Sequence, residues 1–244
     1  MDEKNLWMAV KSDNMYKARQ LLSIGMVDVN CREALNKETP LHVAALRDNL
    51  HLAQLLIDCG ADPNGTDVWG NTALHHAADH GHKDVAQILV THCAGLNMAD
   101  GQGETPLHKA VYRGRREVAQ FLVESGADVT LATKLGRTPL HLAAFAARRD
   151  NFPEPAHKEL IEQLISCGAN MNATDQWGQT PLHLAAGVAR KEMVKALIEC
   201  GADLNVVNNE GRTPLHCLQR SHALLNCNNA KDVAILLIER GAYP

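Results

Sequence analysis

The sequence predicts an all-α fold built from repeated helix pairs, and three observations lead to this prediction. A Thr-Pro-Leu-His tetrapeptide, with one Thr-Ala-Leu-His variant, recurs six times in phase along the 244 residues. A Gly-Ala-Asp marker follows the Thr by 21 residues in the regular units. Aromatic residues make up only 4% of a chain that is 45% hydrophobic, so Leu, Ala, Val and Ile must build the core. The tetrapeptides begin at Thr39, Thr72, Thr105, Thr138, Thr180 and Thr213, spaced by 33, 33, 33, 42 and 33 residues.

Each unit contains the signals for two helices and a turn. The Thr hydroxyl is a good N-cap acceptor, and Pro suits the first helical position, where no N–H is needed. The following Leu and Ala residues face the neighbouring unit. A second helix is indicated by apolar residues at helical spacing, for example Val85, Ile88 and Leu89. The marker Gly then supplies a left-handed cap, and residues 67–70 and 175–178 predict the turns at the tips between units.

These motifs resemble those of the ankyrin-repeat family over nearly the whole chain. The resemblance implies a solenoid of helix-turn-helix units with projecting β-hairpin or finger turns, in a single domain over residues 1–244. A degenerate first unit, in which Trp7 stands in the place of the His, is what an end-capping repeat should show. The predicted repeats are 1–34 (N-terminal cap), 35–66, 67–99, 100–132, 133–174, 175–207 and 208–244.

Two repeats are longer than the others. Repeat five has a nine-residue excess around residues 148–155, and repeat seven has a seven-residue excess around residues 221–229. Both excesses fall between the two helices of the repeat. They are either tolerated surface loops or a docking element, with Phe152 as the only large apolar residue of the first.

Composition excludes several classes of protein. A net charge of −4 argues against a dedicated nucleic-acid binder, and apolar runs of about six residues are too short to span a membrane. The first ten residues do not form a secretory signal. Seven cysteines without a C-x-x-C pair predict free thiols in a reducing compartment, cytoplasmic or nuclear.

The thirteen histidines invite a metal or enzyme hypothesis, but most have a structural interpretation. Six are the last residue of the tetrapeptide, where the family's imidazole hydrogen-bonds within its own turn and toward the next repeat. His76 and His80 are four residues apart, a spacing that suits a metal, yet no further ligand completes a set. We therefore expect no metal, no cofactor and no catalytic residues.

The resemblance places partner recognition on the concave face, formed by the finger tips and the exposed positions of each first helix. By repeat phase, the expected partner-binding residues are Trp69, Asp79, His80, Gln102, Glu104, Tyr112, Arg113, Leu135, Arg137, Phe145, Trp177, Gln179 and Arg212. Residues 103–149 hold eight Lys or Arg against four acids, whereas residues 50–102 hold one Lys against six Asp. This asymmetry predicts an acidic or mixed-charge partner segment over repeats four and five.

The expected function is therefore that of a non-enzymatic adaptor that binds another protein and is monomeric alone. One alternative is a substrate-recognition or inhibitory subunit of a larger complex, although no box that would recruit a ubiquitin ligase follows residue 241. The end at residues 243–244 suggests a piece of a longer chain. Another alternative is a ligand-binding domain that recognises a nucleotide-like molecule through Trp69, Trp177 and nearby basic residues.

An Asn that recurs at the same place of the repeat, at Asn30, Asn64, Asn97, Asn172 and Asn205, has two interpretations. The first is a turn-forming residue whose side chain satisfies local backbone groups. The second follows from the resemblance, because such residues of ankyrin proteins are hydroxylated by an asparaginyl hydroxylase. Asn64 and Asn205, each with a Leu eight residues earlier and an Asp two earlier, are the expected sites.

Overall fold

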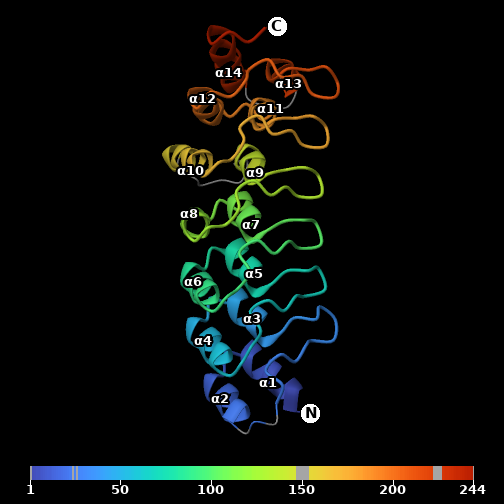
Figure 1. Cartoon of the computed structure of the whole chain (residues 1–244), viewed down its shortest axis with the longest axis vertical. Coiled ribbons are helices and arrows are strands. Elements are labelled where there is room, and N and C mark those ends of the chain that lie inside the picture. The colour runs from blue at the N-terminus through green and yellow to red at the C-terminus, as the bar shows by residue number, and fades with distance from the viewer. Residues whose placement is uncertain (1, 24, 26, 147–153, 222–226, 244) are drawn as a thin grey trace. The chain divides into compact units, whose positions relative to one another are not determined.

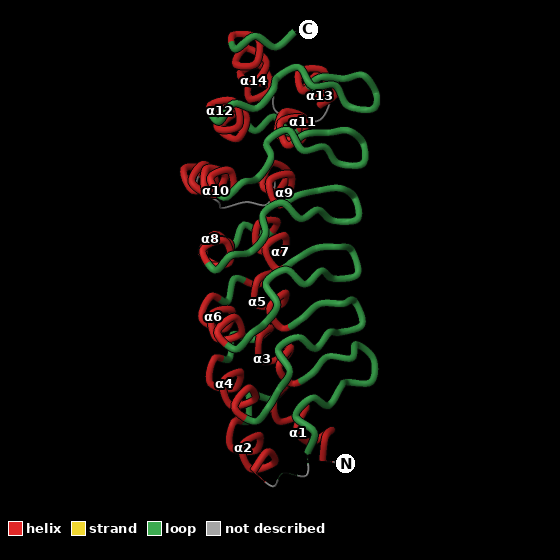
Figure 2. The backbone as a smooth tube through the Cα atoms, viewed as in Figure 1, coloured by secondary structure: helices red, strands yellow, loops and turns green. Residues whose placement is uncertain are grey.

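The computed structural model describes residues 2–23, 25, 27–146, 154–221 and 227–243. Within these ranges there are fourteen α-helices and no β-strand, which confirms the all-α prediction. The finger turns project beside the helices (Figure 2). A backbone hydrogen bond closes a finger turn where the chain reverses, for example from Asp67 N–H to the Asn71 carbonyl at 2.9 Å. The chain divides into two compact units, residues 1–110 with 117–127 and residues 111–116 with 128–244.

In the first unit the helices form two rows, one of first helices and one of second helices (Figure 1). Helix α3 packs against α1, α4 and α5, and α4 packs against α6. Helix α8 belongs mostly to this unit, and the unit also contains most of α7. The bounds are α1 (Asp2–Lys11), α2 (Met15–Ser23), α3 (Pro40–Leu46), α4 (Leu50–Asp58), α5 (Ala73–His80), α6 (Lys83–Thr91), α7 (Pro106–Tyr112) and α8 (Arg116–Glu124).

The second unit repeats this arrangement. Helix α11 packs between α9 and α13 in the row of first helices, while α12 contacts α10 and α14 in the other row. The bounds are α9 (Pro139–Ala146), α10 (Glu154–Ser166), α11 (Pro181–Gly187), α12 (Lys191–Glu199), α13 (Pro214–Ser221) and α14 (Cys227–Glu239). Two helices lie in each of the seven predicted repeat ranges, although the ranges themselves stay a prediction.

The tetrapeptide begins each first helix through a reciprocal cap. In α3, the backbone N–H and the hydroxyl of Thr39 both donate to His42 Nδ1, at 3.1 and 2.8 Å. Because Nδ1 accepts, the ring proton is on Nε2, which donates to the Asn71 carbonyl of the next finger at 2.9 Å. The equivalent His183 reaches the Arg212 carbonyl at 2.9 Å. The imidazoles of His42, His75, His141 and His183 thus cap their own helices and also bond to the following finger.

The core consists of aliphatic layers between neighbouring repeats. The tetrapeptide leucines are essentially inaccessible, with Leu74 and Leu140 at 0% exposure, and small Ala residues around them let the helices approach closely. Repeat phase predicts a buried helix position for Phe121, but its side chain is half-buried on α8. The second helices carry the remaining core side chains on one face, such as Val85 and Leu89 of α6.

Some turn positions restrict the type of residue, either because two backbone segments approach closely or because φ is positive. Gly70 has φ +84°, and a Cβ added there would meet Gly101 N at 2.9 Å, so a side chain is excluded at this finger tip. In repeat three, Cys93 takes the place of the marker Gly and adopts φ +67°.

Most of the insertions of repeats five and seven, including Phe152, lie outside the described residues. None of the helices in the described ranges is long and apolar enough to cross a membrane.

Candidate functional site

The finger tips and the exposed residues of the first helices form what we call the finger-side surface of each unit. All thirteen residues expected to bind a partner are at least partly exposed. Trp69 is 55% exposed on the first unit, and Trp177 is 43% exposed on the second. The position of a residue within the repeat therefore predicted which side chains reach solvent. Which of these side chains lie next to one another is known only from the structure.

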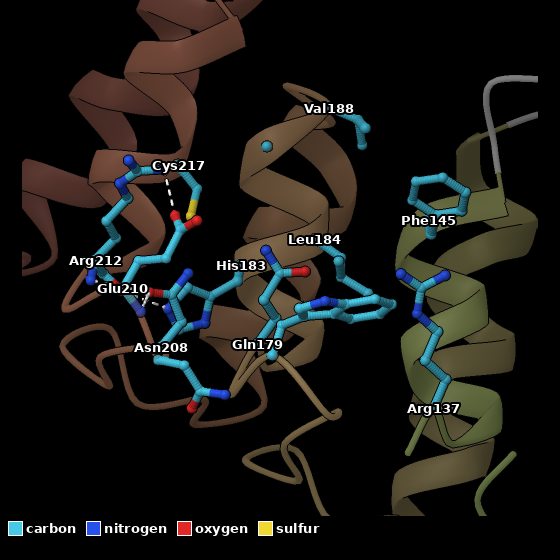
Figure 3. A pocket seen from close by; sticks show the side chains of 13 residues that line it. Arg137, Phe145, Gln179, His183, Leu184, Val188, Asn208, Glu210, Arg212 and Cys217 are labelled. Carbon is cyan, nitrogen blue, oxygen red and sulfur yellow. Dashed lines mark hydrogen bonds and ion pairs between the residues drawn. The ribbon is translucent and has the colours of Figure 1, made fainter. Parts of the chain in front are cut away.

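Five of the expected residues line one pocket of about 470 Å³ in the second unit: Arg137, Phe145, Trp177, Gln179 and Arg212. Phe145 and Arg137 stand at one end, Asn208 and Glu210 stand at the other, and Leu184 lies between them (Figure 3). The pocket is therefore apolar on the side of α9 and α11 and polar on the side of the last finger.

Arg137 is held between two aromatic rings. Its guanidinium carbon lies 5.5 Å from the Phe145 ring centroid and 5.1 Å from that of Trp177. Cation–π contacts of this kind contribute about 0.5–2 kcal/mol each, depending on exposure. The three side chains come from two successive repeats, so their stack joins the finger of repeat five to the finger of repeat six.

A buried carboxylate lies beneath this stack. Asp175 Oδ1 accepts from the backbone N–H groups of Trp177 and Gln179 at 3.0 and 2.9 Å, which shapes the finger turn. Its Oδ2 lies 3.6 Å from Arg137 Nε, and the side chain is 0% exposed. The guanidinium of Arg137 is thus paired with a carboxylate of the same chain. A fully buried carboxylate is unfavourable without a nearby positive charge, so Asp175 favours this position of Arg137.

The source of that cation differs from the pattern in the first unit. The corresponding aspartates there, Asp67 and Asp100, pair with a residue nine positions later on their own first helix. Asp67 Oδ2 contacts His76 Nε2 at 3.0 Å, and Asp100 Oδ2 contacts Lys109 Nζ at 2.7 Å. In repeat six the residue at that position is the apolar Leu184. The preceding finger supplies Arg137 in its place, which leaves Leu184 as pocket wall.

The polar end of the pocket contains a second ion pair. Arg212 Nη1 lies 2.5 Å from Glu210 Oε2, and the two side chains are 37% and 56% exposed. Exposed pairs of this type contribute about 0–1 kcal/mol. The neighbouring Asn208 Oδ1 accepts from the backbone N–H groups of Glu210 and Arg212 and so holds the finger in shape.

On the first unit, Lys109 is paired with two acids, Asp100 at 2.7 Å and Glu104 at 2.5 Å. Burial opposes ionisation of Asp100, but its hydrogen bonds from Lys109 and from the backbone outweigh burial and lower the pKa of the carboxyl. Burial likewise disfavours the charged amine, yet the two carboxylates raise the pKa of Lys109. Glu104 therefore belongs to an internal network as well as to the exposed surface.

The histidines of repeat three make contacts inside the protein. His76 bonds to Asp67, and His80 Nδ1 lies 3.0 Å from the His76 carbonyl. His80 also stacks on His82 with 5.7 Å between the ring centroids. Burial acts to raise the pKa of Asp67, but the hydrogen bonds from His76 and Asn71 together outweigh it and lower the pKa to about 2. In the part of the chain that the structure describes, no three His, Cys, Asp or Glu side chains converge to hold a metal ion.

Tyr112, Arg113 and Leu135 do not line the pocket of the second unit. The Arg113 guanidinium lies 5.8 Å from the Tyr112 ring, at the end of α7. Leu135 is 42% exposed at its finger tip, where its carbonyl accepts from Gln176 N–H at 3.0 Å.

The first unit has a smaller pocket, of about 290 Å³, which the sequence did not predict. Trp7 and Lys11 of α1 line it together with Leu35 of the first finger. Within the described ranges, the buried Trp7 Nε1 atom has no hydrogen-bond partner, although Trp7 occupies the place of the finger-binding imidazole. The larger indole of the capping repeat thus does not make the bond that the imidazole makes elsewhere.

The recurring asparagines connect adjacent repeats. Asn64 Oδ1 accepts from Gly95 N–H at 2.7 Å, and its Nδ2 donates to the Cys93 carbonyl at 3.2 Å. Asn205 does the same toward the end of the chain, with Tyr243 N–H at 2.9 Å and the Gly241 carbonyl at 3.3 Å. Both carboxamides are therefore occupied in the fold.

The thiols for which the structure gives a state are all free: Cys31, Cys59, Cys93, Cys167, Cys200 and Cys217. Burial, as the largest influence, raises the pKa of Cys200, which makes this thiol a poorer nucleophile.

Sequence reasoning missed Leu184, Gly187 and Val188, which form the apolar wall of the larger pocket. A signal was present. Gly187 is the seventh residue after its tetrapeptide Thr, and the preceding four repeats have a side chain at this place: Leu46, Asp79, Tyr112 and Phe145. The register alone marks Gly187 as a gap on the finger-side surface.

Comparison with known proteins supports the fold and its repeats. Family models described as ankyrin repeats match residues 6–100 and 152–244 (three copies) and residues 89–143 (many copies). The crystal structure of the ankyrin repeat domain of Bcl-3, described as a unique member of the IkappaB protein family, is 29% identical with a TM-score of 0.75. The match covers 94% of this chain and 96% of that one. The human ASB11 ankyrin repeat domain is 27% identical with a TM-score of 0.76, over 98% of both chains. A search among curated proteins found no match.

Proposed function

The chain belongs to the ankyrin-repeat family, and from this premise we propose that it acts by binding another protein through its finger-side surface. Ankyrin repeats are generally protein-interaction modules without enzymatic activity of their own. The proposed role is that of an adaptor, with no chemistry of its own.

The observation that carries the proposal is the stack of Phe145, Arg137 and Trp177 at the pocket of the second unit. Aromatic residues and Arg are the side chains that dominate binding energy at protein interfaces. Trp177 and Phe145 are 43% and 36% exposed, so each has apolar surface to bury against a partner. The contacts with Arg137 and Asp175 hold the stack in place before binding, which reduces the entropy lost when a partner docks.

The charges favour a mixed-charge partner segment over a purely acidic one. Of the basic residues in repeats four and five, Lys109 is paired with Asp100 and Glu104, and Arg137 is paired with Asp175. A partner acid would compete with these carboxylates. Exposed Lys134 remains to attract a partner acid, and such rim charges act mainly on the association rate.

Affinity capture with crosslinking from the native host tests the proposal. Phe145→Ala and Trp177→Ala are expected to lose the captured partner, and Tyr112→Ala and Arg113→Ala to weaken its capture. The matched control is Tyr16→Ala, which removes an 80% exposed aromatic side chain from α2, outside the finger-side surface. Capture that is indifferent to all four substitutions contradicts the finger-side assignment.

Two more specific functions would use the same surface. A substrate-recognition or inhibitory subunit would use it within a larger complex, and native mass spectrometry of captured assemblies distinguishes that role from a binary adaptor. A nucleotide-like ligand would use a finger Trp for stacking. In that version, nucleotides raise the melting temperature of the chain, and Trp69→Ala or Trp177→Ala removes the increase.

Hydroxylation of Asn64 and Asn205 also remains a proposal. Because both carboxamides bridge neighbouring turns, a modifying enzyme would have to reach them after local opening of the repeat. Intact mass of protein from its native host, with peptide mapping, tests this. Absence of an added oxygen on both residues contradicts it.

A further inference from the structure

The larger pocket exists because a side chain is missing from the first helix of repeat six. Gly187 ends α11 at the position where the preceding four repeats present a side chain. It lines the pocket together with Leu184 and Val188 of the same helix region. A Cβ built on Gly187 meets no heavy atom within 4 Å, so the space above it is open. Among the described residues, no side chain fills this gap.

About half of the pocket lining is apolar, and this half includes Phe145, Trp177, Leu184 and Val188. Phe145 lies on one side and Leu184 and Val188 on the other, while the finger of repeat seven adds polar groups at the far end (Figure 3). Trp177 also lines the pocket. The volume of about 470 Å³ lies within the range of about 300–1,000 Å³ that is typical of ligand pockets. The space is thus large enough for a bulky side chain of another molecule.

The charges around the pocket are paired within the chain. Arg137 faces the buried carboxylate of Asp175, and Arg212 faces Glu210. His183, in the floor of the pocket, uses both ring nitrogens in bonds to Thr180 and to the Arg212 carbonyl. A charged occupant would have to displace one of these partners, whereas an uncharged apolar occupant requires no such exchange.

We propose that the gap at Gly187 receives one large apolar side chain, aromatic or long aliphatic, from a peptide segment of the partner protein. This inference rests on the proposed function and adds the chemistry that the partner must present. The inserted side chain packs against Trp177, Leu184 and Val188. The flanking backbone of the segment lies over the polar end of the pocket, where Asn209 and Gln179 supply amide groups.

Substitution of Gly187 offers a test that fills the pocket without removing a side chain that lines it. Gly187→Leu and Gly187→Phe place a side chain in the open space, and Gly187→Ala is the matched control that adds only a methyl group. Val188→Trp narrows the same pocket from the adjacent residue. Thermal unfolding of each variant verifies that it folds.

The probe is a phage-displayed library of random peptides selected on the full chain. We expect enriched peptides to share a large apolar residue. They should bind Gly187→Leu, Gly187→Phe and Val188→Trp about tenfold to a hundredfold more weakly than wild type, because the variants exclude a side chain of that size. Binding to Gly187→Ala should stay within about twofold of wild type.

Two results overturn the inference. If the enriched peptides depend on Trp177 but bind the pocket-filled variants as well as wild type, the finger-side surface still binds partners and the gap is not used. If enrichment yields no peptide with a large apolar residue, or binding is indifferent to both Trp177→Ala and Gly187→Leu, the inference fails together with the choice of this surface.

Discussion

Acidification should destabilise this protein through its buried tetrapeptide histidines. Burial, the largest influence, lowers the pKa of His42 and of His75 to about 4, from an ordinary value of 6.5. Geometry gives the same direction, because Nδ1 of each ring accepts from a Thr N–H and hydroxyl and has no room for a proton. Burial also lowers the pKa of His141 and of His183.

The sign and size follow from proton linkage. A histidine whose folded pKa is lowered binds fewer protons in the folded state, so stability falls as pH drops below about 6.5 and the loss levels off near pH 4. Between about pH 7.5 and pH 5, one such histidine costs about 2 kcal/mol, and His42 and His75 together cost about 4 kcal/mol. A domain with about 5–15 kcal/mol of stability would lose a large part of it.

Urea unfolding followed by circular dichroism at a series of pH values measures this loss. Nearby charged groups also influence the pKa of each ring: Asp67 and His76 act on His42, and Asp100 and Lys109 act on His75. The variants used in the test therefore leave these four residues unchanged. His75→Gln retains an acceptor and a donor at this position but cannot be protonated, so about 2 kcal/mol of the acid-dependent loss should disappear.

The matched control is His51→Gln, since His51 is exposed on α4. It should show the same acid-dependent loss as wild type. A stability curve that is flat between about pH 7.5 and pH 5, or a His75→Gln curve that falls as steeply as wild type, would refute the assignment of the neutral imidazole.

Three further outcomes follow from the geometry. Gly187→Ala should raise stability by about 0.5–1 kcal/mol in thermal unfolding, because the helical glycine loses backbone freedom and the methyl enters open space. Asn64→Ala should lower stability by about 1–3 kcal/mol in urea, since Gly95 N–H and the Cys93 carbonyl lose their bridge; an unchanged midpoint would contradict the bridging role. Lys109→Met should destabilise the chain at neutral pH by leaving the Asp100 carboxylate without its cation. Because the pKa of Asp100 is lowered in the wild type, the difference should shrink as acid protonates the carboxyl, and a pH-independent difference would indicate lost packing instead.

Repeat phase predicted much of this molecule because the relevant information is local. A Thr followed by Pro, Leu and His specifies a capped helix from neighbouring residues alone, and six copies in phase leave little choice of fold. The same phase predicted that Trp69, Phe145 and Trp177 reach solvent, since a residue's place in the repeat decides which face it occupies. Phe121 shows the limit, because repeat phase predicts a buried position and its side chain is half-buried.

The sequence by itself determined the repeated helix pairs, the capping role of the histidines and the side of each unit that carries the fingers. Only the tertiary structure decided which charges remain available and where a cavity opens. In repeat six, Leu184 stands where other repeats have the cation that pairs with the finger aspartate. Asp175 pairs instead with Arg137 of the preceding repeat, so the pair connects two repeats. The missing side chain at Gly187 becomes a pocket only when Phe145, Trp177 and Val188 are placed around it. Pairing and open space are properties of distances between layers, which a pattern within one repeat does not specify.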